Sequence, residues 1–312
     1  MSCCWLSMTG LVRAPKLARL MTNVQSRRDL EANRLDSRAM KLRFVKMNGL
    51  GNDFMVVEWP KGRPAPNADV VRRWGDRRLG VGFDQLLLIG ADRPKNGDAS
   101  YRIFNADGGE VEQCGNGVRC LASFLAPRLG KELTLVGPAG STLAKVVSAE
   151  RVSVDLGEPS FDPKALPFTA PERRDRYSLR LPDRSVEFGA VSMGNPHIVI
   201  SVDSVERAPV GILGPVLERH PSFPQRVNVG FMQRVDERHI KLRVFERGVG
   251  ETLACGTGAA AAVAVGRLWG ELASDVEVSL PGGILEVSWR GPGSTLWQTG
   301  ATSAVYEGQI DL

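Results

Sequence analysis

Two cysteines, Cys114 and Cys255, stand in the same short motif, Cys-Gly-x-Gly. Residues typical of a helix follow each motif, so each cysteine is expected at the N-terminus of a helix. Free backbone N–H groups and the positive end of the helix dipole meet at such a place and attract anions. The pKa of a thiol there is expected to fall below about 8.5, which favours the reactive thiolate. Both cysteines are therefore candidate acid–base or nucleophilic groups.

The sequence around one cysteine repeats around the other. With the two cysteines aligned, Arg102 falls on Arg243 and Glu110 falls on Glu251. Further equivalent pairs are Phe104 with Phe245, Gly109 with Gly250, Gly117 with Gly258, Asn52 with Asn195, and Gln85 with Asn228. We infer two copies of one α/β unit, related by an approximate two-fold axis.

Two equivalent thiols that face one small molecule suit the inversion of a stereocentre. One group removes a proton from one face and the other delivers a proton to the opposite face. This is the chemistry of a cofactor-independent racemase or epimerase. A zinc site is not expected, because the chain has three histidines and no cluster of soft ligands. Cys120 is interpreted as a small buried residue on the inner face of its helix.

Short β-like runs alternate with a few helices from residue 41 onward. The strands expected from alternating and β-branched patterns are 42–47, 54–58, 84–89, 101–104, 133–136, 151–156, 186–193, 197–202, 227–233, 240–245, 276–280 and 283–289. The expected helices are 69–79, 116–128, 211–219 and 257–269. A proline-rich stretch from Pro159 to Pro171 is typical of a linker between two parts of similar size.

Composition excludes several classes of protein. The 312 residues are 43% hydrophobic and 24% charged, and no uncharged apolar run reaches the length of a membrane span. Five cysteines are too few and odd in number for a disulfide scaffold. The net charge of +5 would suit a nucleic-acid partner. Seven basic and three acidic residues in 1–40 account for +4 of it, however, so no nucleic-acid partner is expected.

Residues 1–40 form a leader that lies outside the repeated units. It is interpreted as a disordered segment or the product of a start site placed too far upstream, and Met40 opens a β-like run typical of a natural N-terminus. The first 28 residues lack acids and contain Ser, Thr and Arg, which leaves an organellar transit peptide as the alternative. The expected location is accordingly the cytoplasm, or an organelle if the leader is a transit peptide.

The body of the chain closely resembles the diaminopimelate epimerase family. The resemblance covers 41–312 and rests on an ordered series of motifs. These are 47–54 (MNGLGNDF), 82–85 (GFDQ), 105–108 (NADG), 114–117 (CGNG), 194–197 (GNPH), 226–228 (RVN), 246–248 (ERG) and 255–258 (CGTG). The resemblance implies pyridoxal-independent interconversion of LL- and meso-diaminopimelate, on the route to lysine and peptidoglycan, with no cofactor.

The resemblance also implies a fold. It is an α+β fold of two pseudo-symmetric domains, each a curved, mostly antiparallel sheet around a central helix. The implied domains are 41–157 with 301–312, and 158–300. The active site lies between them. The family pattern implies a homodimer, with Tyr306 at the dimer contact.

The family's site residues carry over position by position. Cys114 and Cys255 match the catalytic acid–base pair, and His197 and Glu246 match positions that tune proton transfer. The positions that match substrate-binding residues are Asn52, Gln85, Asn105, Gly115, Asn116, Asn195, Asn228, Glu246, Arg247, Gly256 and Thr257. Asn48 and Thr257 depart from residues common in the family, and neither change touches the expected chemistry.

Two rival functions remain open from the sequence. One is a racemase for another amino acid, such as a proline-type substrate, although so many amides exceed what proline needs. The other is a nucleotide- or anion-binding module, since Gly256–Ala261 loosely matches a dinucleotide-binding loop. Duplicated thiols favour the epimerase, because a nucleotide site needs no pair of thiols.

Overall fold

The computed structural model describes residues 40–170 and 172–312. Residues 43–308 form one compact unit, and residues 40–42 with 309–312 belong to another, in which the Leu312 N–H donates to the Met40 carbonyl at 3.1 Å. The predicted leader, apart from Met40, lies outside the described residues. Below, 43–157 is called the first half and 158–300 the second half; the domain limits at these positions stay predictions.

The first half is a mixed α/β arrangement with mostly antiparallel strand pairs. Buried apolar residues alternate along most of its strands and face a shared core. Its elements are β1 (Lys41–Gly49), β2 (Asn52–Glu58), α2 (Ala68–Gly75), β3 (Gln85–Ile89), β4 (Ala99–Asn105), β5 (Glu110–Val111), α3 (Gly115–Leu129), β6 (Glu132–Gly137), β7 (Gly140–Ser148) and β8 (Arg151–Asp155).

The second half has the same mixture of strands and a central helix; β17 crosses its end, and β18 follows it. A 3-10 turn at Pro163–Ala165 lies within the proline-rich stretch predicted as a linker. The other elements are β9 (Tyr177–Arg180), β10 (Ser185–Ser192), β11 (Pro196–Ser201), α4 (Val210–Glu218), β12 (Asn228–Arg234), β13 (His239–Glu246), β14 (Gly250–Thr252), α5 (Gly256–Leu268), β15 (Asp275–Leu280), β16 (Gly283–Ser288), β17 (Trp297–Ala301) and β18 (Ser303–Asp311). The predicted two-part α/β fold class is confirmed.

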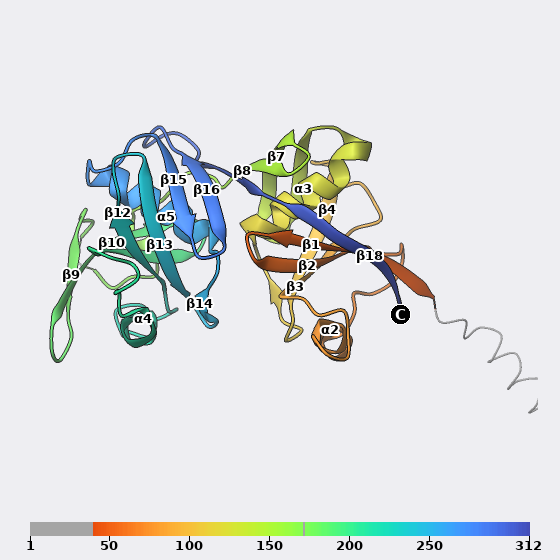
Figure 1. The fold of residues 1–312 in the computed structure, drawn as a ribbon, viewed down its shortest axis with the longest axis horizontal. Helices are drawn as coiled ribbons and strands as arrows, with labels where there is room; N and C mark the ends of the chain where they lie inside the picture. Colours follow the sequence, from red (N-terminus) through yellow and green to blue (C-terminus); the bar gives the residue numbers. More distant parts are fainter. Residues whose placement is uncertain (1–39, 171) are drawn as a thin grey trace, which may run out of the picture. The chain divides into compact units, whose positions relative to one another are not determined.

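Each half surrounds one central helix with strands, as Figure 1 shows for α3 and α5. Helix α3 packs against β6, β7 and β8, and α5 packs against β10, β11, β12 and β16. Every residue of α5 from Ala259 to Gly266 is buried. A helix that is apolar on all sides must be enclosed by other elements. Because its residues are small, the strands approach it closely.

The strand registers repeat between the halves. The parallel pair β2–β3 aligns Phe54 with Gln85, and the parallel pair β11–β12 aligns His197 with Asn228. Bidentate ion pairs repeat as well. Arg102 donates to Glu110 at 2.7 and 2.6 Å, and Arg243 donates to Glu251 at 2.6 and 2.9 Å. The same pairing therefore closes each hairpin that leads into a Cys-Gly-x-Gly motif.

Where the sequence prediction and the structure differ, local chemistry explains the difference. The helix predicted over 69–79 ends at Gly75. The Asp76 carboxylate accepts hydrogen bonds from the backbone N–H groups of Arg78 and Leu79, both at 2.7 Å, which forms a turn in place of helix. Strands β5, β7, β9, β14, β17 and β18 are not among those predicted from pattern, because they are short or lack a clear alternation.

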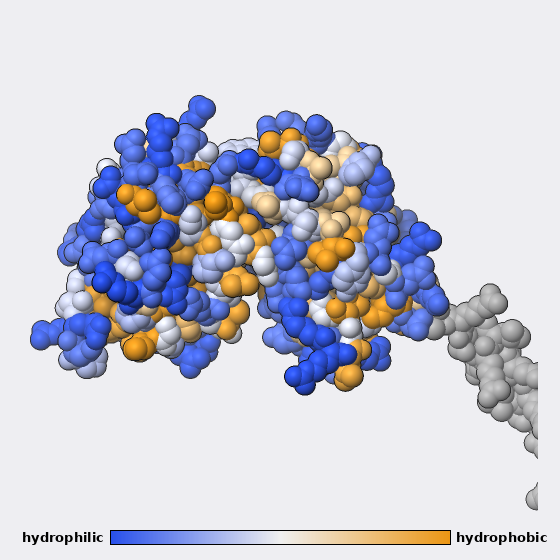
Figure 2. All heavy atoms as spheres, viewed as in Figure 1, coloured by the Kyte–Doolittle hydropathy of each residue, from blue (hydrophilic) through white to orange (hydrophobic). Residues whose placement is uncertain are grey.

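The surface of the described residues is mixed in hydropathy. On the face in Figure 2, hydrophilic residues cover most of the area, and hydrophobic residues show between them in separate patches. Among residues 40–170 and 172–312, no helix is long and apolar enough to cross a membrane.

The close approach of α5 to β10 gives a prediction on stability. A Cβ atom at Gly189 would lie 2.4 Å from Val265 Cγ1 and 3.0 Å from Trp269 Cζ2. We expect Gly189→Ala to lower the free energy of unfolding by about 1–3 kcal/mol, because overpacking forces the helix away from the strand. Urea denaturation measures the change.

The matched control is Gly211→Ala in α4. A Cβ there meets nothing within 4 Å. Because alanine favours helix over glycine, this variant is expected to be as stable as the parent or up to about 1 kcal/mol more stable. Equal stability of the Gly189→Ala protein and its parent would contradict the packing argument.

Candidate active site

A cavity of about 980 Å³ brings both cysteines of the repeated motif together. Its wall includes most of the residues that the sequence predicts as a site. These are Asn52, Gln85, Asn105, Cys114, Gly115, Asn116, Asn195, Glu246, Cys255, Gly256 and Thr257. Residues separated by up to about two hundred positions in the sequence thus share one pocket, and the pocket draws on both halves.

Each cysteine occupies the N-cap position of a central helix. The backbone of Cys114 and of Cys255 is extended, and the first helical hydrogen bonds run from Val118 N–H to the Cys114 carbonyl at 2.9 Å and from Ala259 N–H to the Cys255 carbonyl at 3.0 Å. The N–H groups between them therefore have no helical partner. A Cβ at Gly258 would lie 2.9 Å from Val244, so only glycine fits this close turn.

The predicted lowering of the thiol pKa values is wrong. Burial raises the pKa of Cys114 to about 11, and burial followed by the charge of Glu246 raises the pKa of Cys255 well above its ordinary value. Backbone N–H groups of Gly117 and Gly258 do pull the two pKa values down. Loss of hydration outweighs them, because a buried thiolate has no water to stabilise its charge.

A side-chain amide lies close to each thiol. Cys114 Sγ donates toward Asn52 Oδ1 at 3.7 Å. In the second half, Asn195 Nδ2 donates to Thr257 Oγ1 at 3.3 Å, and that hydroxyl lies 3.7 Å from Cys255 Sγ. The two equivalent asparagines therefore have different contacts, one directly with the thiol and one through a hydroxyl.

Glu246 is the carboxylate of the pocket whose charge acts on both thiols. Burial raises its pKa, while hydrogen bonds with Thr252 and Cys255 lower it. The Thr252 hydroxyl donates to Glu246 Oε1 at 2.5 Å. The negative charge of Glu246 opposes ionisation of both thiols. An ammonium group next to Glu246 would relieve this opposition.

Four predicted residues do not line the cavity. Asn228 is buried below it, where its amide donates to the Pro196 carbonyl and accepts from the Arg247 N–H, both at 2.9 Å. Arg247 Nη1 donates to the Gln225 carbonyl at 3.3 Å. His197 is buried behind Asn195, and Tyr306 lies on β18. Their predicted roles stay predictions.

His197 is neutral and supports Asn195. Burial, with the nearby Arg247 charge, lowers the pKa of His197 to about 3. The Asn195 amide nitrogen faces Thr257, so its Oδ1 faces the ring and accepts from His197 Nε2–H at 2.9 Å. The ring acts on the pocket through this asparagine.

Arg119 lies behind the cavity wall and supports it, and the sequence did not predict this role. Its side chain is fully buried in α3, and it donates to Asn116 Oδ1 at 2.5 Å and to Gln298 Oε1 at 2.7 Å. Gln298 in turn donates to the Gly256 carbonyl at 2.7 Å. Burial lowers the pKa of Arg119 to about 10, so it remains charged at neutral pH. The sequence signal that could have identified Arg119 is its position as a lone charged residue in the apolar helical run 118–125.

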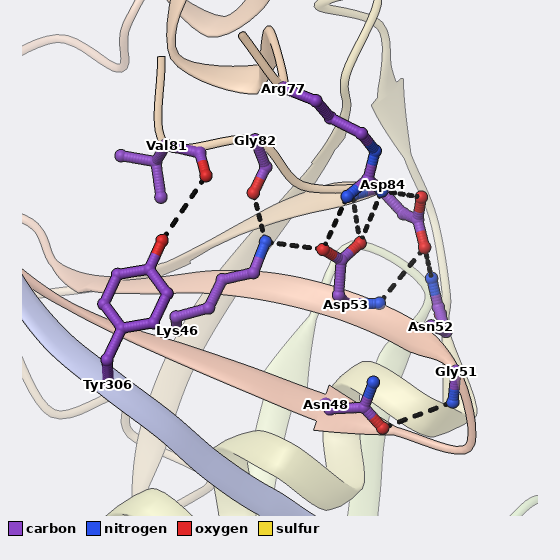
Figure 3. Close-up of polar contacts among 10 residues, drawn as sticks. All are labelled: Lys46, Asn48, Gly51, Asn52, Asp53, Arg77, Val81, Gly82, Asp84 and Tyr306. Atoms are coloured by element: carbon purple, nitrogen blue, oxygen red, sulfur yellow. Dashed lines mark hydrogen bonds and ion pairs between the residues drawn. The ribbon is translucent and has the colours of Figure 1, made fainter.

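A second group of residues that the sequence did not predict is a charged cluster next to Asn52, drawn in Figure 3. Asp53, Arg77 and Asp84 also line the cavity. Arg77 donates to both carboxylates, at 2.8 and 2.9 Å to Asp53 and 2.7 Å to Asp84. Lys46 donates to Asp53 at 2.5 Å and to the Gly82 carbonyl. Asp84 belongs to the motif at 82–85, and this motif was the sequence signal that could have identified it as a site residue.

Tyr306 contacts the same region of the first half. Its hydroxyl donates to the Val81 carbonyl at 3.4 Å, as Figure 3 shows, and its ring meets Phe44 edge-to-face with centroids 6.0 Å apart. Its side chain is nearly half exposed.

The described residues contain no group of three or more His, Cys, Asp or Glu side chains that could hold a metal ion. What the cavity does offer is two thiols, N–H groups without helical partners at two helix starts, several amides and the Glu246 carboxylate near both thiols. This set can bind a small zwitterion and move a proton at its carbon.

Comparison with known proteins identifies relatives over most of the chain. The sequence profile described as diaminopimelate epimerase matches residues 44–161 and 189–305. Proteins named diaminopimelate epimerase from Nitrosomonas europaea and Alkalilimnicola ehrlichii are each 50% identical, over 277 and 278 residues. Each match covers 88% of this chain and all of the relative.

A solved structure shares the fold. A hydroxyproline epimerase from Agrobacterium vitis, with trans-4-hydroxy-L-proline bound, superposes with a TM-score of 0.64. The match covers 88% of this chain and 94% of that chain at 17% sequence identity. An identity this low supports the fold alone.

Arg119 gives a prediction on stability. We expect Arg119→Met to lower the free energy of unfolding by about 2–4 kcal/mol, because the oxygens of Asn116 and Gln298 lose a buried donor. Guanidinium denaturation measures it. Arg128→Met, on the same helix, is the control: its half-exposed ion pair with Glu58 should contribute about 1 kcal/mol or less. Equal losses in the two variants would contradict the role given to Arg119.

His197 gives a prediction on pH. The unfolded chain binds a proton at His197 below about pH 6.5, and the folded protein does not until about pH 3, so acid favours unfolding through this group. Between pH 7 and pH 5 the parent should lose about 2 kcal/mol more stability than His197→Gln, in which position 197 does not titrate. Parallel losses in the two proteins would show that His197 is not held neutral.

Proposed function

This chain belongs to the diaminopimelate epimerase family, and we propose that Cys114 and Cys255 are the two acid–base groups with which it interconverts LL- and meso-diaminopimelate. One observation carries the proposal. The two thiols occupy equivalent N-cap positions of two central helices, and they line one cavity. A small molecule in that cavity has a thiol available from each copy of the repeated unit.

The proposed reaction balances without a cofactor. The thiolate of one cysteine takes the proton of the substrate α-carbon, and the electron pair stays on the carbon as a carbanion. The thiol of the other cysteine then delivers its proton to the opposite face of that carbon. The configuration is inverted, and the first cysteine ends as a thiol and the second as a thiolate. The reverse reaction uses the same groups with their roles exchanged.

The helix starts supply the electrostatic part of the mechanism. The N–H groups that follow Cys114 and Cys255 have no helical partners, and they can hold the α-carboxylate next to the reacting carbon. Charge that develops on this carboxylate as the proton leaves is stabilised by the same groups. Because they are fixed by the helices, they need no reorganisation during the reaction.

Binding of the substrate supports ionisation of a thiol. Burial raises the pKa of both cysteines, and the charge of Glu246 raises it further. An ammonium group beside Glu246 offsets that negative charge, so the thiolate becomes easier to form when the substrate is present. A high resting pKa also makes each thiolate a stronger base toward carbon. The remaining amides on the wall can hold the distal polar groups of a bis-amino acid.

Other predicted properties are part of the same proposal. The chain works as a homodimer with Tyr306 at the contact, and it works in the cytoplasm. Exposed apolar side chains at Val305 and Tyr306 on β18 support the dimer. Family membership does not support the anion-binding module.

Isotope exchange tests the reaction directly. Purified protein in D₂O, without added cofactor, should incorporate deuterium at the α-carbon of diaminopimelate while LL and meso forms interconvert. Mass spectrometry and NMR follow both events. Exchange with proline derivatives and none with diaminopimelate would show that the substrate is wrong while leaving two-base chemistry in place.

Variants of the two cysteines test the mechanism. Cys114→Ala and Cys255→Ala should each lower the epimerisation rate about 10²–10⁴-fold, because each removes one of the two proton-transfer groups. Cys120→Ala is the matched control, since this buried thiol lies on α3 away from the cavity wall and its loss should leave the rate within about twofold. Full activity in either of the first two variants would exclude the two-base mechanism.

A further inference from the structure

The Asn52 amide lies between a thiol and a carboxylate. Its Oδ1 is 3.7 Å from Cys114 Sγ, and its Nδ2 donates to Asp84 Oδ2 at 3.0 Å. We propose that Asp84 is a positioning residue: it fixes the orientation of the Asn52 amide, so that Cys114 always faces a hydrogen-bond acceptor. The proposal rests on the proposed role of Cys114 as an acid–base group.

An amide has two ends with opposite properties. Its oxygen accepts hydrogen bonds and its nitrogen donates them, whereas a carboxylate can only accept. Rotating the Asn52 amide by half a turn would place Oδ1 against Asp84 Oδ2 in the position that Nδ2 now occupies. Two acceptors would then face each other. Asp84 therefore allows one orientation, in which Nδ2 faces the carboxylate and Oδ1 faces the sulfur.

Asp84 is itself held from several sides, as Figure 3 shows. The Asp53 N–H donates to Asp84 Oδ2 at 3.1 Å, and Arg77 Nη2 donates to Asp84 Oδ1 at 2.7 Å. The Asp84 N–H returns a bond to Asp53 Oδ1 at 2.9 Å. Asn52 thus contacts a carboxylate whose two oxygens are both engaged, and the carboxylate cannot turn away without breaking these bonds.

The rest of the cluster anchors this arrangement. Burial alone would raise the pKa of Asp53, but hydrogen bonds from Arg77 and Lys46 outweigh it and hold that pKa well below its ordinary value. Asp53 therefore remains charged and keeps its bidentate contact with Arg77. With two cations and two carboxylates, the cluster is electrically neutral, so its effect on Cys114 is through geometry.

The second half has no counterpart of this carboxylate. In the alignment of the two units, Asp84 corresponds to Val227 and Phe54 corresponds to His197. Asn195 accepts from His197 and directs its amide nitrogen toward Thr257. Equivalent asparagines therefore present opposite ends: an oxygen toward Cys114 and a nitrogen toward the hydroxyl beside Cys255. Asp84 is what makes the Cys114 side different.

An acceptor that faces a thiol stabilises the S–H form. The charged groups that act on Cys114 are Glu246, which disfavours the thiolate, and Arg119, which favours it. Neither is changed by a substitution at Asp84. If the amide were free to turn, its NH₂ group would face the sulfur part of the time and stabilise the thiolate. Loss of the Asp84 charge should therefore lower the pKa of Cys114 and leave that of Cys255 unchanged.

The test is the pH profile of thiol alkylation in Asp84→Asn. The full-length protein is treated with iodoacetamide from pH 6 to 11, and peptides that contain Cys114 and Cys255 are quantified separately by mass spectrometry. In Asp84→Asn the Cys114 profile should move to lower pH, with alkylation at pH 8 about three- to tenfold faster. The Cys255 profile should stay in place. A mere loosening of the fold would speed both thiols by a similar factor at every pH.

Two further variants complete the comparison. Asp92→Asn, which removes an exposed carboxylate paired with Lys61 at 2.8 Å, should leave both profiles unchanged. Asp84→Asn also leaves the cluster with one net positive charge, which by itself lowers the pKa of Cys114. Arg77→Lys is therefore measured as well, because it keeps the cluster neutral while lysine cannot hold Asp53 and Asp84 with the same fork of donors. It should shift Cys114 in the same direction. An unchanged Cys114 profile in Arg77→Lys would overturn the proposal, because a shift in Asp84→Asn alone would then be an effect of charge.

Measuring alkylation and activity separately distinguishes the positioning role of Asp84 from the acid–base role of Cys114 on which it rests. Alkylation needs no turnover, so the profile decides on Asp84 even if the parent protein does not act on diaminopimelate. If the parent is active and Cys114 shifts, the epimerisation rate of Asp84→Asn should fall about tenfold, because a misdirected amide no longer holds the proton of Cys114 in place.

Discussion

The guanidinium of Arg119 links the N-terminal ends of the two central helices that border the cavity. It lies fully buried in α3, bonds to Asn116 near the start of that helix, and reaches the start of α5 through Gln298 and the Gly256 carbonyl. The starts of both central helices are thereby tied to one charged group.

Duplication explains how two distant parts of a chain build equivalent surroundings for two thiols. The parallel pairs β2–β3 and β11–β12, and the ion pairs Arg102–Glu110 and Arg243–Glu251, place each Cys-Gly-x-Gly turn by the same means. Small residues of α5 then let the strands of the second half close tightly around it. Each feature serves the same end, which is to present a helix start with free N–H groups to a shared pocket.

Sequence reasoning predicted the features that local patterns encode. Strands such as β12, the four helices and the repeated cysteines follow from alternation, glycine spacing and residue type. Features that depend on partners from elsewhere in the chain were not predicted. Arg119 and Asp84 matter because the fold brings Gln298 and Asn52 to them. The sign of the thiol pKa shift was wrong for the same reason, since burial by distant segments outweighs the helix start that the sequence reveals.

Joining the two repeated units in one chain has an evolutionary consequence. In a symmetric pair of identical short chains, any residue placed beside one thiol must also stand beside the other. A fused chain is free of this restriction, because each copy can change separately. The aspartate at 84 opposite valine at 227, and the phenylalanine at 54 opposite histidine at 197, are such separate changes. A single chain can therefore surround each thiol with different residues.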